Sequence, residues 1–361
     1  MNVAQRAKKA VRALDRFQQR WPGLAFPVAV WKKFSDDQAG NLAALISYYA
    51  FLAIFPLLLI LFTVLNVVLR DHQDLQDRVI NGALTDYPGF ASLLRDSIQS
   101  FHETGPALVF GVILTVLGTR GVANAIQNAL NSVWEVPRSQ RPGFPWSWVR
   151  SFALILVVGL GEITVSVGSG FIAAATFLPG FALKAASTVV TLTFNIGLFW
   201  LAFRLATAKA VSWRDLRLGA LAGGVAWQIL QLVGGYYITH EVVHSRSLYG
   251  QTIGVVLGLI GWMFLQAEAT LYVAEANVVW VRKLWPRSLA APPQTKEDVR
   301  AYELYAQAQD RKGETVTVDV TSLPDTEHGS EKMPQGAGAD GAPVSSRPAR
   351  GEDRHDSGDD R

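Results

Sequence analysis

Long stretches without a charged side chain recur along the chain as far as about residue 281. The first, between Asn41 and Leu69, contains no Asp, Glu, Lys, Arg or His. A helix rises about 1.5 Å per residue, so a run of this length is more than enough to cross a hydrocarbon core about 30 Å thick. The pattern predicts a membrane span.

Five further runs of the same kind follow, and together they predict a bundle of six transmembrane helices. The expected spans are 41–69, 104–122, 151–180, 185–204, 218–239 and 249–281. The second is close to the minimum length for a span and could continue as far as Trp134. The third could be one long tilted helix or a helix with a re-entrant turn at Pro179–Gly180, and we expect a single crossing.

The distribution of basic residues supports this count. From the N- to the C-terminus, the segments outside the apolar runs hold eight, three, four, one, four, one and twelve Lys or Arg residues. Cytoplasmic loops are enriched in Lys and Arg, so the alternation of rich and poor segments fits six crossings. Both termini are expected in the cytoplasm.

Residues 1–40 precede the first span and contain a basic amphipathic stretch, AKKAVRALDRFQQRW. Its apolar residues recur at helical spacing, at Ala10, Leu14, Phe17 and Trp21. Such a helix is expected to lie on the anionic cytoplasmic leaflet, and a nucleic-acid-binding arm is the less favoured alternative. We therefore expect membrane lipids, and no nucleic acid, as partners.

Residues 288–361 differ in composition from the rest of the chain. From about Ala290 they are rich in Pro, Gly, Ala, Asp and Arg and contain few aromatic residues. Such a segment cannot bury enough apolar surface to fold, so we expect a disordered cytoplasmic tail. The membrane domain is assigned to residues 41–287.

The overall composition fits a membrane protein. Half of the 361 residues are hydrophobic, 17% are charged, and the mean hydropathy is +0.20 despite the polar end. The absence of cysteine excludes disulfides, thiolate metal sites and cysteine nucleophiles. A cleavable signal peptide does not explain the first apolar run, because the basic segment 1–40 precedes it.

Pro56 lies in the middle of the first apolar run. Proline removes one backbone hydrogen bond and bends a helix, which a membrane tolerates only where neighbouring helices or polar groups satisfy the freed carbonyl. Pro56 therefore predicts a kink inside a packed bundle, either as a functional hinge or as a bend needed for packing.

Three stretches resemble the YihY/virulence factor BrkB family. They are FSDDQAGNLAALISYYAFLAIFPLLLILFTVL at the first span, GVANAIQNALNSVWEV after the second, and SLYGQTIGVVLGLIGWMFLQAEATLYVAEANVVW at the last. The resemblance covers about residues 36–280 and is specific as a combination. Val273 stands where the family usually has glycine.

The resemblance implies a six-span protein of the bacterial inner membrane. Most members of that family have no established activity. The family has been described as a ribonuclease, and other members have been linked to serum resistance or to the movement of lipids or lipopolysaccharide precursors.

Three carboxylates lie inside the expected spans, at Glu162, Glu268 and Glu275. A central charge in a membrane helix costs about 2.5–3.5 kcal/mol, so each is expected to have a partner or a polar cavity, which favours a functional role. Glu268 and Glu275 are seven residues apart and share one helix face with Tyr272. Arg120, at the expected cytoplasmic end of the second span, is the expected ion partner of Glu275.

A stripe of amides follows Arg120. It consists of Asn124, Gln127, Asn128 and Asn131, which fall along one helix face. Amides donate and accept hydrogen bonds without a net charge, so the stripe suits a water-filled groove or a headgroup site. Alternatively, the amides join helices through hydrogen bonds worth about 0.6 kcal/mol each.

The sequence gives little support for an enzyme. It has no glycine-rich phosphate loop and no Ser-His-Asp set at a suggestive spacing. HEVVH at 240–244 has two histidines four residues apart but no evident third ligand. We therefore expect no metal, no cofactor and no enzymatic activity.

Together these features predict an all-α membrane protein that moves a lipid or a small amphipathic solute. Arg120 and the amide stripe would bind a polar group, and the three glutamates would line the path or carry protons. The alternative is a non-transporting scaffold or envelope-integrity factor in which the same residues lock helices together. A membrane-bound hydrolase is a third, weaker alternative.

Overall fold

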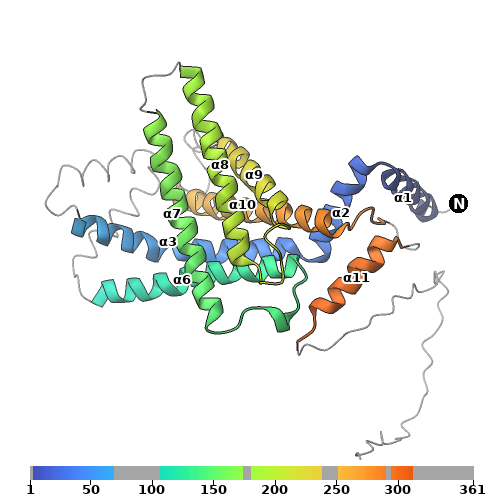
Figure 1. The fold of residues 1–361 in the computed structure, drawn as a ribbon, viewed down its shortest axis with the longest axis horizontal. Helices are drawn as coiled ribbons and strands as arrows, with labels where there is room; N and C mark the ends of the chain where they lie inside the picture. Colours follow the sequence, from blue (N-terminus) through green and yellow to red (C-terminus); the bar gives the residue numbers. More distant parts are fainter. Residues whose placement is uncertain (1–2, 69–105, 174–179, 238–250, 290–293, 312–361) are drawn as a thin grey trace, which may run out of the picture. The chain divides into compact units, whose positions relative to one another are not determined.

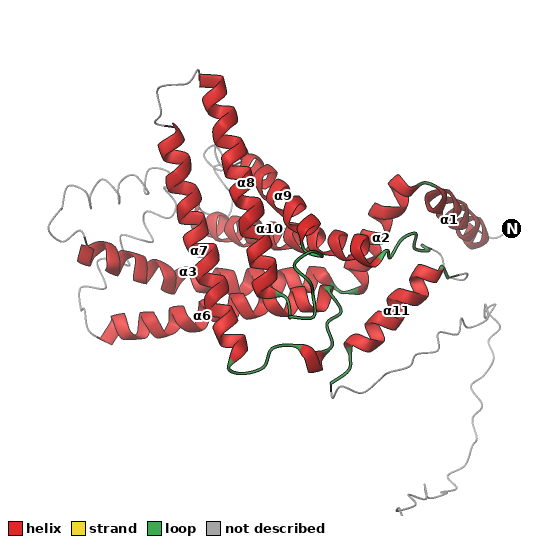
Figure 2. Cartoon of the chain, in the orientation of Figure 1, coloured by secondary structure: helices red, strands yellow, loops and turns green. Residues whose placement is uncertain are grey.

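The computed structural model describes residues 3–68, 106–173, 180–237, 251–289 and 294–311. Within these ranges all regular secondary structure is helical, as Figure 2 shows. The all-α fold class expected from the sequence is therefore confirmed.

Six long helices coincide with the six expected spans (Figure 1). They are α3 (Ala39–Val68), α6 (Pro106–Val133), α7 (Trp146–Ala173), α8 (Gly180–Ala206), α9 (Arg217–Tyr237) and α10 (Gln251–Arg282). Pro56 lies inside α3. The second expected span takes its longer form, because α6 continues beyond residue 122 to Val133.

Two of these helices are long and apolar enough to cross a membrane: α8 and the part Val256–Arg282 of α10. In the most apolar 18-residue stretch of each helix, only 17% and 11% of the residues, respectively, are buried against the rest of the protein. The core helix of a soluble protein would be mostly buried, so these outward-facing apolar side chains favour contact with lipid. Membrane crossing by each of the six helices stays a prediction, as does the position of both termini.

Helix α10 packs against four other helices, namely α2 (Pro22–Asp36), α3, α6 and α9. Spacings of four, three and four residues place Ala267, Leu271, Ala274 and Val278 on one face of α10, and all four are buried. Figure 1 shows α3 beside α6, and α8 packs against both α7 and α9. Helix α1 (Val3–Arg20) packs against α2.

A further helix, α11 (Lys296–Ala308), follows the last expected span. It begins at a capping box, in which the side chain of Thr295 accepts from the backbone N–H of Asp298 and the Asp298 carboxylate accepts from that of Thr295. Ala301 on its inner face is completely buried. The helix is thus defined by its cap and packed into the fold.

The expectation that residues 288–361 are disordered is therefore wrong for residues 294–311. The Pro- and Gly-rich composition of the segment as a whole hides one short helix that is capped and has an apolar face to bury. Residues 312–361 lie outside the described part of the chain.

Helices α8 and α9 approach closely at Gly224. A Cβ atom there would lie 2.6 Å from Cγ1 of Ile196 and 2.9 Å from its backbone nitrogen.

Because backbone atoms cannot move aside, we expect Gly224→Ala to destabilise the detergent-solubilised protein by about 1–3 kcal/mol, seen as a lower thermal unfolding midpoint. Gly159→Ala on α7 is the control, since no described atom lies within 4 Å of the added Cβ. Equal midpoints for the two variants would contradict the close approach.

Candidate functional site

Lys33 is completely buried on the inner face of α2. Ala25 and Ala29, which precede it by two turns and by one turn, are buried as well. The helical repeat therefore directs the Lys33 side chain into the protein, and the charged residue occupies a position of the apolar stripe.

Three carboxylates surround the Lys33 ammonium, and the four residues together form what we call the Lys33 cluster. Nζ lies 2.5 Å from Asp37 Oδ2, 2.5 Å from Glu135 Oε1 and 3.0 Å from Glu275 Oε2. It also donates a hydrogen bond to the backbone carbonyl of Val133 at 2.9 Å. One ammonium thus holds together the end of α2, the end of α6 and α10 at a point about two turns before α10 ends.

The turn that ends α6 positions Glu135. Its φ is 45°, a left-handed conformation that is uncommon for a residue other than glycine. Its backbone N–H donates to the carbonyl of Ser132 at 2.9 Å, and Val136 N–H donates to that of Asn131 at 2.9 Å. These two bonds close the end of α6 and aim the carboxylate at Lys33.

The Lys33 cluster carries more negative than positive charge. Its three carboxylates face one ammonium, and Arg282 adds a second positive charge near Glu135. Both oxygens of Glu135 and of Glu275 accept no hydrogen bond from the described residues, their ion contacts with Lys33 apart. Burying an ion costs several kcal/mol, so a bound proton would relieve the excess charge.

The environment shifts the pKa values in the direction that this charge balance requires. Burial alone would lower the pKa of Lys33, but the carboxylates of Glu275, Glu135 and Asp37 outweigh burial and raise the pKa well above its ordinary value. Burial raises the pKa of Glu135, although the Lys33 ammonium opposes the shift. Lys33 therefore stays charged, and Glu135 takes up a proton more readily than an exposed glutamate.

A pocket of about 220 Å³ lies directly beside the cluster. Glu135 lines it together with Arg282 and Asp215, so both signs of charge face the space. Trp134 and Val211 supply apolar surface. The pocket can therefore accept a small molecule or group with polar and apolar parts, and Glu135 borders it although both of its carboxylate oxygens are buried.

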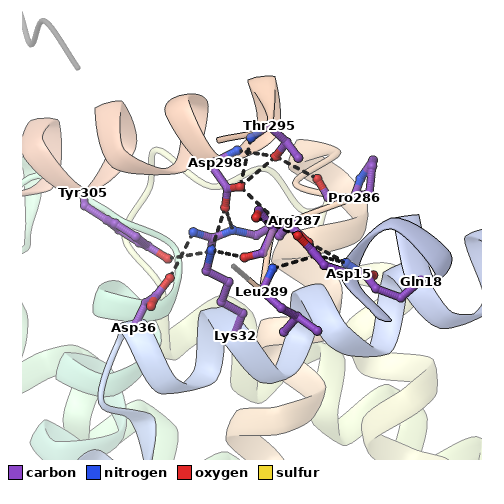
Figure 3. A network of polar contacts seen from close by, with 11 residues as sticks. Asp15, Gln18, Lys32, Asp36, Pro286, Arg287, Leu289, Thr295, Asp298 and Tyr305 are labelled. Carbon is purple, nitrogen blue, oxygen red and sulfur yellow. Dashed lines mark hydrogen bonds and ion pairs between the residues drawn. The ribbon is translucent and has the colours of Figure 1, made fainter. Parts of the chain in front are cut away.

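Figure 3 shows a second polar network, which we call the Arg287 network. Arg287 is completely buried, and its guanidinium contacts Asp298 through Nε at 2.9 Å and Asp36 through Nη2 at 3.0 Å. Asp298 also accepts from Lys32 Nζ at 2.9 Å and from the backbone N–H of Ser288 at 2.9 Å. Helix α11 is thereby attached to α2 and to the segment after α10.

Tyr305 on α11 joins the two networks. Its hydroxyl accepts a hydrogen bond from Arg287 Nη1 at 3.4 Å, and Lys33 Nζ lies 5.7 Å from the centre of its ring. Burial raises the pKa of Tyr305, so the hydroxyl stays neutral. Its side chain therefore contacts the cationic groups of both networks without adding a charge.

The ion pair expected between Arg120 and Glu275 is wrong. Glu275 pairs with Lys33, and the Arg120 guanidinium lies over the Trp148 ring at 3.8 Å from its centre. The reason is the length of α6, which continues past Arg120 to Val133 and brings the following Glu135 to the level of Glu275.

The other ionisable residues expected in the spans do not contact Lys33. Glu268 is half-buried one turn before Tyr272, whose ring stacks on Phe34 at a centroid distance of 3.8 Å. Glu162 is half-buried on α7. Of the three glutamates, Glu275 alone belongs to the Lys33 cluster, and the HEVVH segment lies outside the described residues.

The amide stripe divides into two pairs. Gln127 and Asn131 are buried, whereas Asn124 and Asn128 are exposed. Gln127 donates to Ser151 Oγ on α7 at 2.9 Å. Asn131 donates to the carbonyl at the end of α8 and accepts from the backbone N–H of residue 208 at 2.8 Å. The buried pair therefore joins helices, as in the packing alternative, and the exposed pair remains open for contact with another molecule.

Sequence reasoning missed Lys33, Asp37 and Glu135. The sequence did contain a signal for Lys33, which follows Ala25 and Ala29 at the same four-residue spacing. It also contained one for Glu135, which stands between apolar residues in SVWEVP. The Lys33 side chain is a hundred residues away in sequence from its Val133 partner, so nothing local pairs them.

Removing the ammonium tests the energetic role of the cluster. Lys33→Met leaves buried carboxylates without a counter-ion, so we expect the free energy of unfolding of the detergent-solubilised protein to fall by about 3–5 kcal/mol. The double variant Lys33→Met/Glu135→Gln should recover part of that loss. Lys9→Met, at an exposed position of α1, is the matched control. Equal stability of the two single variants would refute the role of Lys33.

The Arg287 network predicts a pH dependence. Burial would raise the pKa of Asp298, but hydrogen bonds from Lys32, the Ser288 N–H and Arg287 lower it from 3.8 to about 2. A lowered folded-state pKa means that the stabilisation is present above 3.8 and is lost as the pH falls toward 2. We expect the stability difference between wild type and Asp298→Asn to shrink by about 2 kcal/mol over this interval, measured by chemical denaturation. The exposed Glu303→Gln should show no such change.

Comparison with known proteins places these residues in a family. The profile described as "Virulence factor BrkB" matches residues 30–298, a range that contains the whole Lys33 cluster. A UPF0761 membrane protein of Azotobacter vinelandii is 25% identical over 280 residues, which are 72% of this chain and 65% of that protein. The inner membrane protein YhjD of Escherichia coli is 24% identical over 278 residues, or 71% of this chain and 81% of YhjD.

A UPF0761 membrane protein of Neisseria meningitidis serogroup B is 26% identical over 266 residues, covering 69% of this chain and 63% of that protein. The chain thus spans less than two thirds of the Azotobacter and Neisseria relatives. No solved structure matches it. The resemblance recognised in the sequence is confirmed, and the chain is a membrane protein that belongs to the virulence factor BrkB family.

Proposed function

We propose that this protein moves a lipid or an amphipathic solute across the bacterial inner membrane, with the Lys33 cluster as the group that takes up and releases a proton. The observation that carries the proposal is the excess of buried carboxylates over ammonium in that cluster. Both termini lie in the cytoplasm in this proposal, which the alternation of basic segments supports. The protein is not an enzyme in this proposal.

Protonation has a direct structural consequence in such a cluster. A neutral Glu135 attracts Lys33 far less than an ionised one, so its protonation loosens the contact between α2 and the end of α6. Asp37 and Glu275 retain the ammonium in that state. The cluster can therefore take two charge states, which differ in how strongly the end of α6 is held to α2, and such a difference can shift the balance between two conformations.

The pocket beside Glu135 offers a place for the polar part of the cargo. Arg282 supplies a positive group and Asp215 a negative one, while the exposed Asn124 and Asn128 supply uncharged donors and acceptors further along α6. Arg120 lies on the same helix. Glu162 and Glu268 would line the path through the membrane, since carboxylates in membrane helices usually face an interior cavity.

A non-transporting scaffold is the second candidate. The hydrogen bonds of Gln127 and Asn131 favour it, because these amides join α6 to α7 and to the end of α8. A scaffold has no need for a protonatable excess charge, however, so the two candidates differ in what they predict for Glu135.

Reconstitution into liposomes separates the two candidates. We expect the wild type to accelerate the movement of fluorescently labelled phosphatidylethanolamine or phosphatidylglycerol between leaflets, and Glu135→Gln to abolish the acceleration. The variant should fold normally, because it removes one buried negative charge from a cluster with an excess of them. Glu162→Gln is expected to lower the rate in the same assay.

Glu303→Gln, an exposed change on α11, is the control and should retain the wild-type rate. Thermal unfolding of each variant in detergent verifies that lost movement is not lost folding. If wild type and empty liposomes move the lipids equally, or if Glu135→Gln only shifts the unfolding midpoint, the scaffold becomes the better account.

A further inference from the structure

Large aromatic side chains are exposed at one end of the described fold. They come from α1, the α1–α2 junction, α2 and the end of α10: Phe17 (52% exposed), Trp21 (60%), Trp31 (58%) and Trp280 (52%). Phe17 and Trp21 contact each other at a centroid distance of 6.2 Å, and Phe26 joins α2 to Trp280 at 5.8 Å. These exposed rings form what we call the aromatic rim.

The polar side of α1, not its apolar side, faces the protein. Asp15 is buried and accepts hydrogen bonds from Ser288 Oγ at 3.0 Å and from the Leu289 N–H at 2.9 Å. Gln18 is buried and donates to the carbonyl of Arg287 at 2.8 Å. The helix is therefore fixed in a rotation that leaves Phe17 and its apolar neighbours pointing away from the protein.

Helix α2 continues the exposed apolar surface. Leu24 and Trp31 are exposed, on the side of the helix away from Ala25, Ala29 and Lys33. The buried side is occupied by the contact with α10, whereas Leu24 and Trp31 stay about half exposed in the described part of the chain.

The charges on α1 identify the partner. Its exposed basic residues are Lys9, Arg12, Arg16 and Arg20, and they flank the apolar face. Basic residues beside apolar and aromatic ones match a bilayer surface, where anionic headgroups meet the hydrocarbon, and Trp rings are favoured at that depth.

We infer that α1 and α2 dock as one platform on the anionic surface of the leaflet that faces the N-terminus, with the aromatic rim at headgroup level. The inference adds α2 and the end of α10 to the lipid contact that the sequence predicts for the amphipathic stretch 7–21. It does not depend on the proposed transport function.

Docking at this level also fixes the depth of the Lys33 cluster. Glu275 precedes Trp280 by five residues on α10, which corresponds to about 7.5 Å along the helix axis. The cluster then lies at the boundary between headgroups and hydrocarbon, beside the pocket that Glu135 lines.

Site-directed fluorescence tests the platform in the full-length protein. The chain contains no cysteine, so each introduced cysteine gives one labelling site. Phe17→Cys and Trp31→Cys, labelled with an environment-sensitive NBD dye, are reconstituted into vesicles of phosphatidylcholine with phosphatidylglycerol. Arg300→Cys, an exposed position on α11, is the matched control. All three changes are at exposed positions and leave the core intact.

We expect blue-shifted emission and quenching by nitroxide-labelled lipid at Phe17→Cys and Trp31→Cys, and neither at Arg300→Cys. Adding Arg12→Gln and Arg16→Gln to Phe17→Cys should lower the ratio of docked to undocked α1 about five-fold for each charge removed. Water-like emission without lipid quenching at Phe17→Cys and Trp31→Cys would overturn the inference. Self-quenching between labels without lipid quenching would also overturn it, since a second copy of the chain would then cover the rim.

Discussion

One buried ammonium, that of Lys33, connects parts of the chain that lie far apart in the sequence. Its three carboxylate partners come from the residue after α2, the turn after α6 and the interior of α10. Removing an ion from water costs several kcal/mol, and only contacts made together repay that cost. The burial of Lys33 is therefore favourable only when α2, α6 and α10 are all in their final positions. The cluster thus helps to specify the fold and is also a candidate site.

Adjacent lysines on α2 serve different networks because neighbouring residues on a helix point about 100° apart. Lys33 points into the cluster, whereas Lys32 Nζ contacts Asp298 at 2.9 Å in the Arg287 network. Tyr305 contacts the cations of both. Helix α2 is thus a common support: the cluster fixes it to the membrane helices, and the Arg287 network fixes α11 to it. Both networks therefore act on the same helix, of about four turns.

The sequence was sufficient for the positions of the long helices, because apolar runs of more than 18 residues have few alternatives. It also identified Glu275 and the buried amides, whose polarity stands out against apolar surroundings. It could not pair Lys33 with its carboxylates or Asp15 with Leu289, since the latter contact joins residues 274 positions apart. Helix α11 was missed for a different reason: average composition over a long segment concealed a local capping box at Thr295.

The charge excess of the Lys33 cluster is hard to explain by stability alone. A buried ion pair is often no better than well-packed apolar residues of similar volume, and a third carboxylate adds cost without adding a partner. The excess is tolerable where a proton can enter, and Glu135 contacts the buried ammonium and is also one of the residues that line a pocket. If the aromatic rim lies at headgroup level, this pocket lies at the boundary between the aqueous phase and the hydrocarbon core. Proton exchange with the aqueous phase would then occur at Glu135, and its effect on Lys33 would reach α10 through Glu275. The excess of carboxylates thus lowers the stability of the unprotonated cluster, and for the same reason a proton bound there would alter the contacts between the helices most.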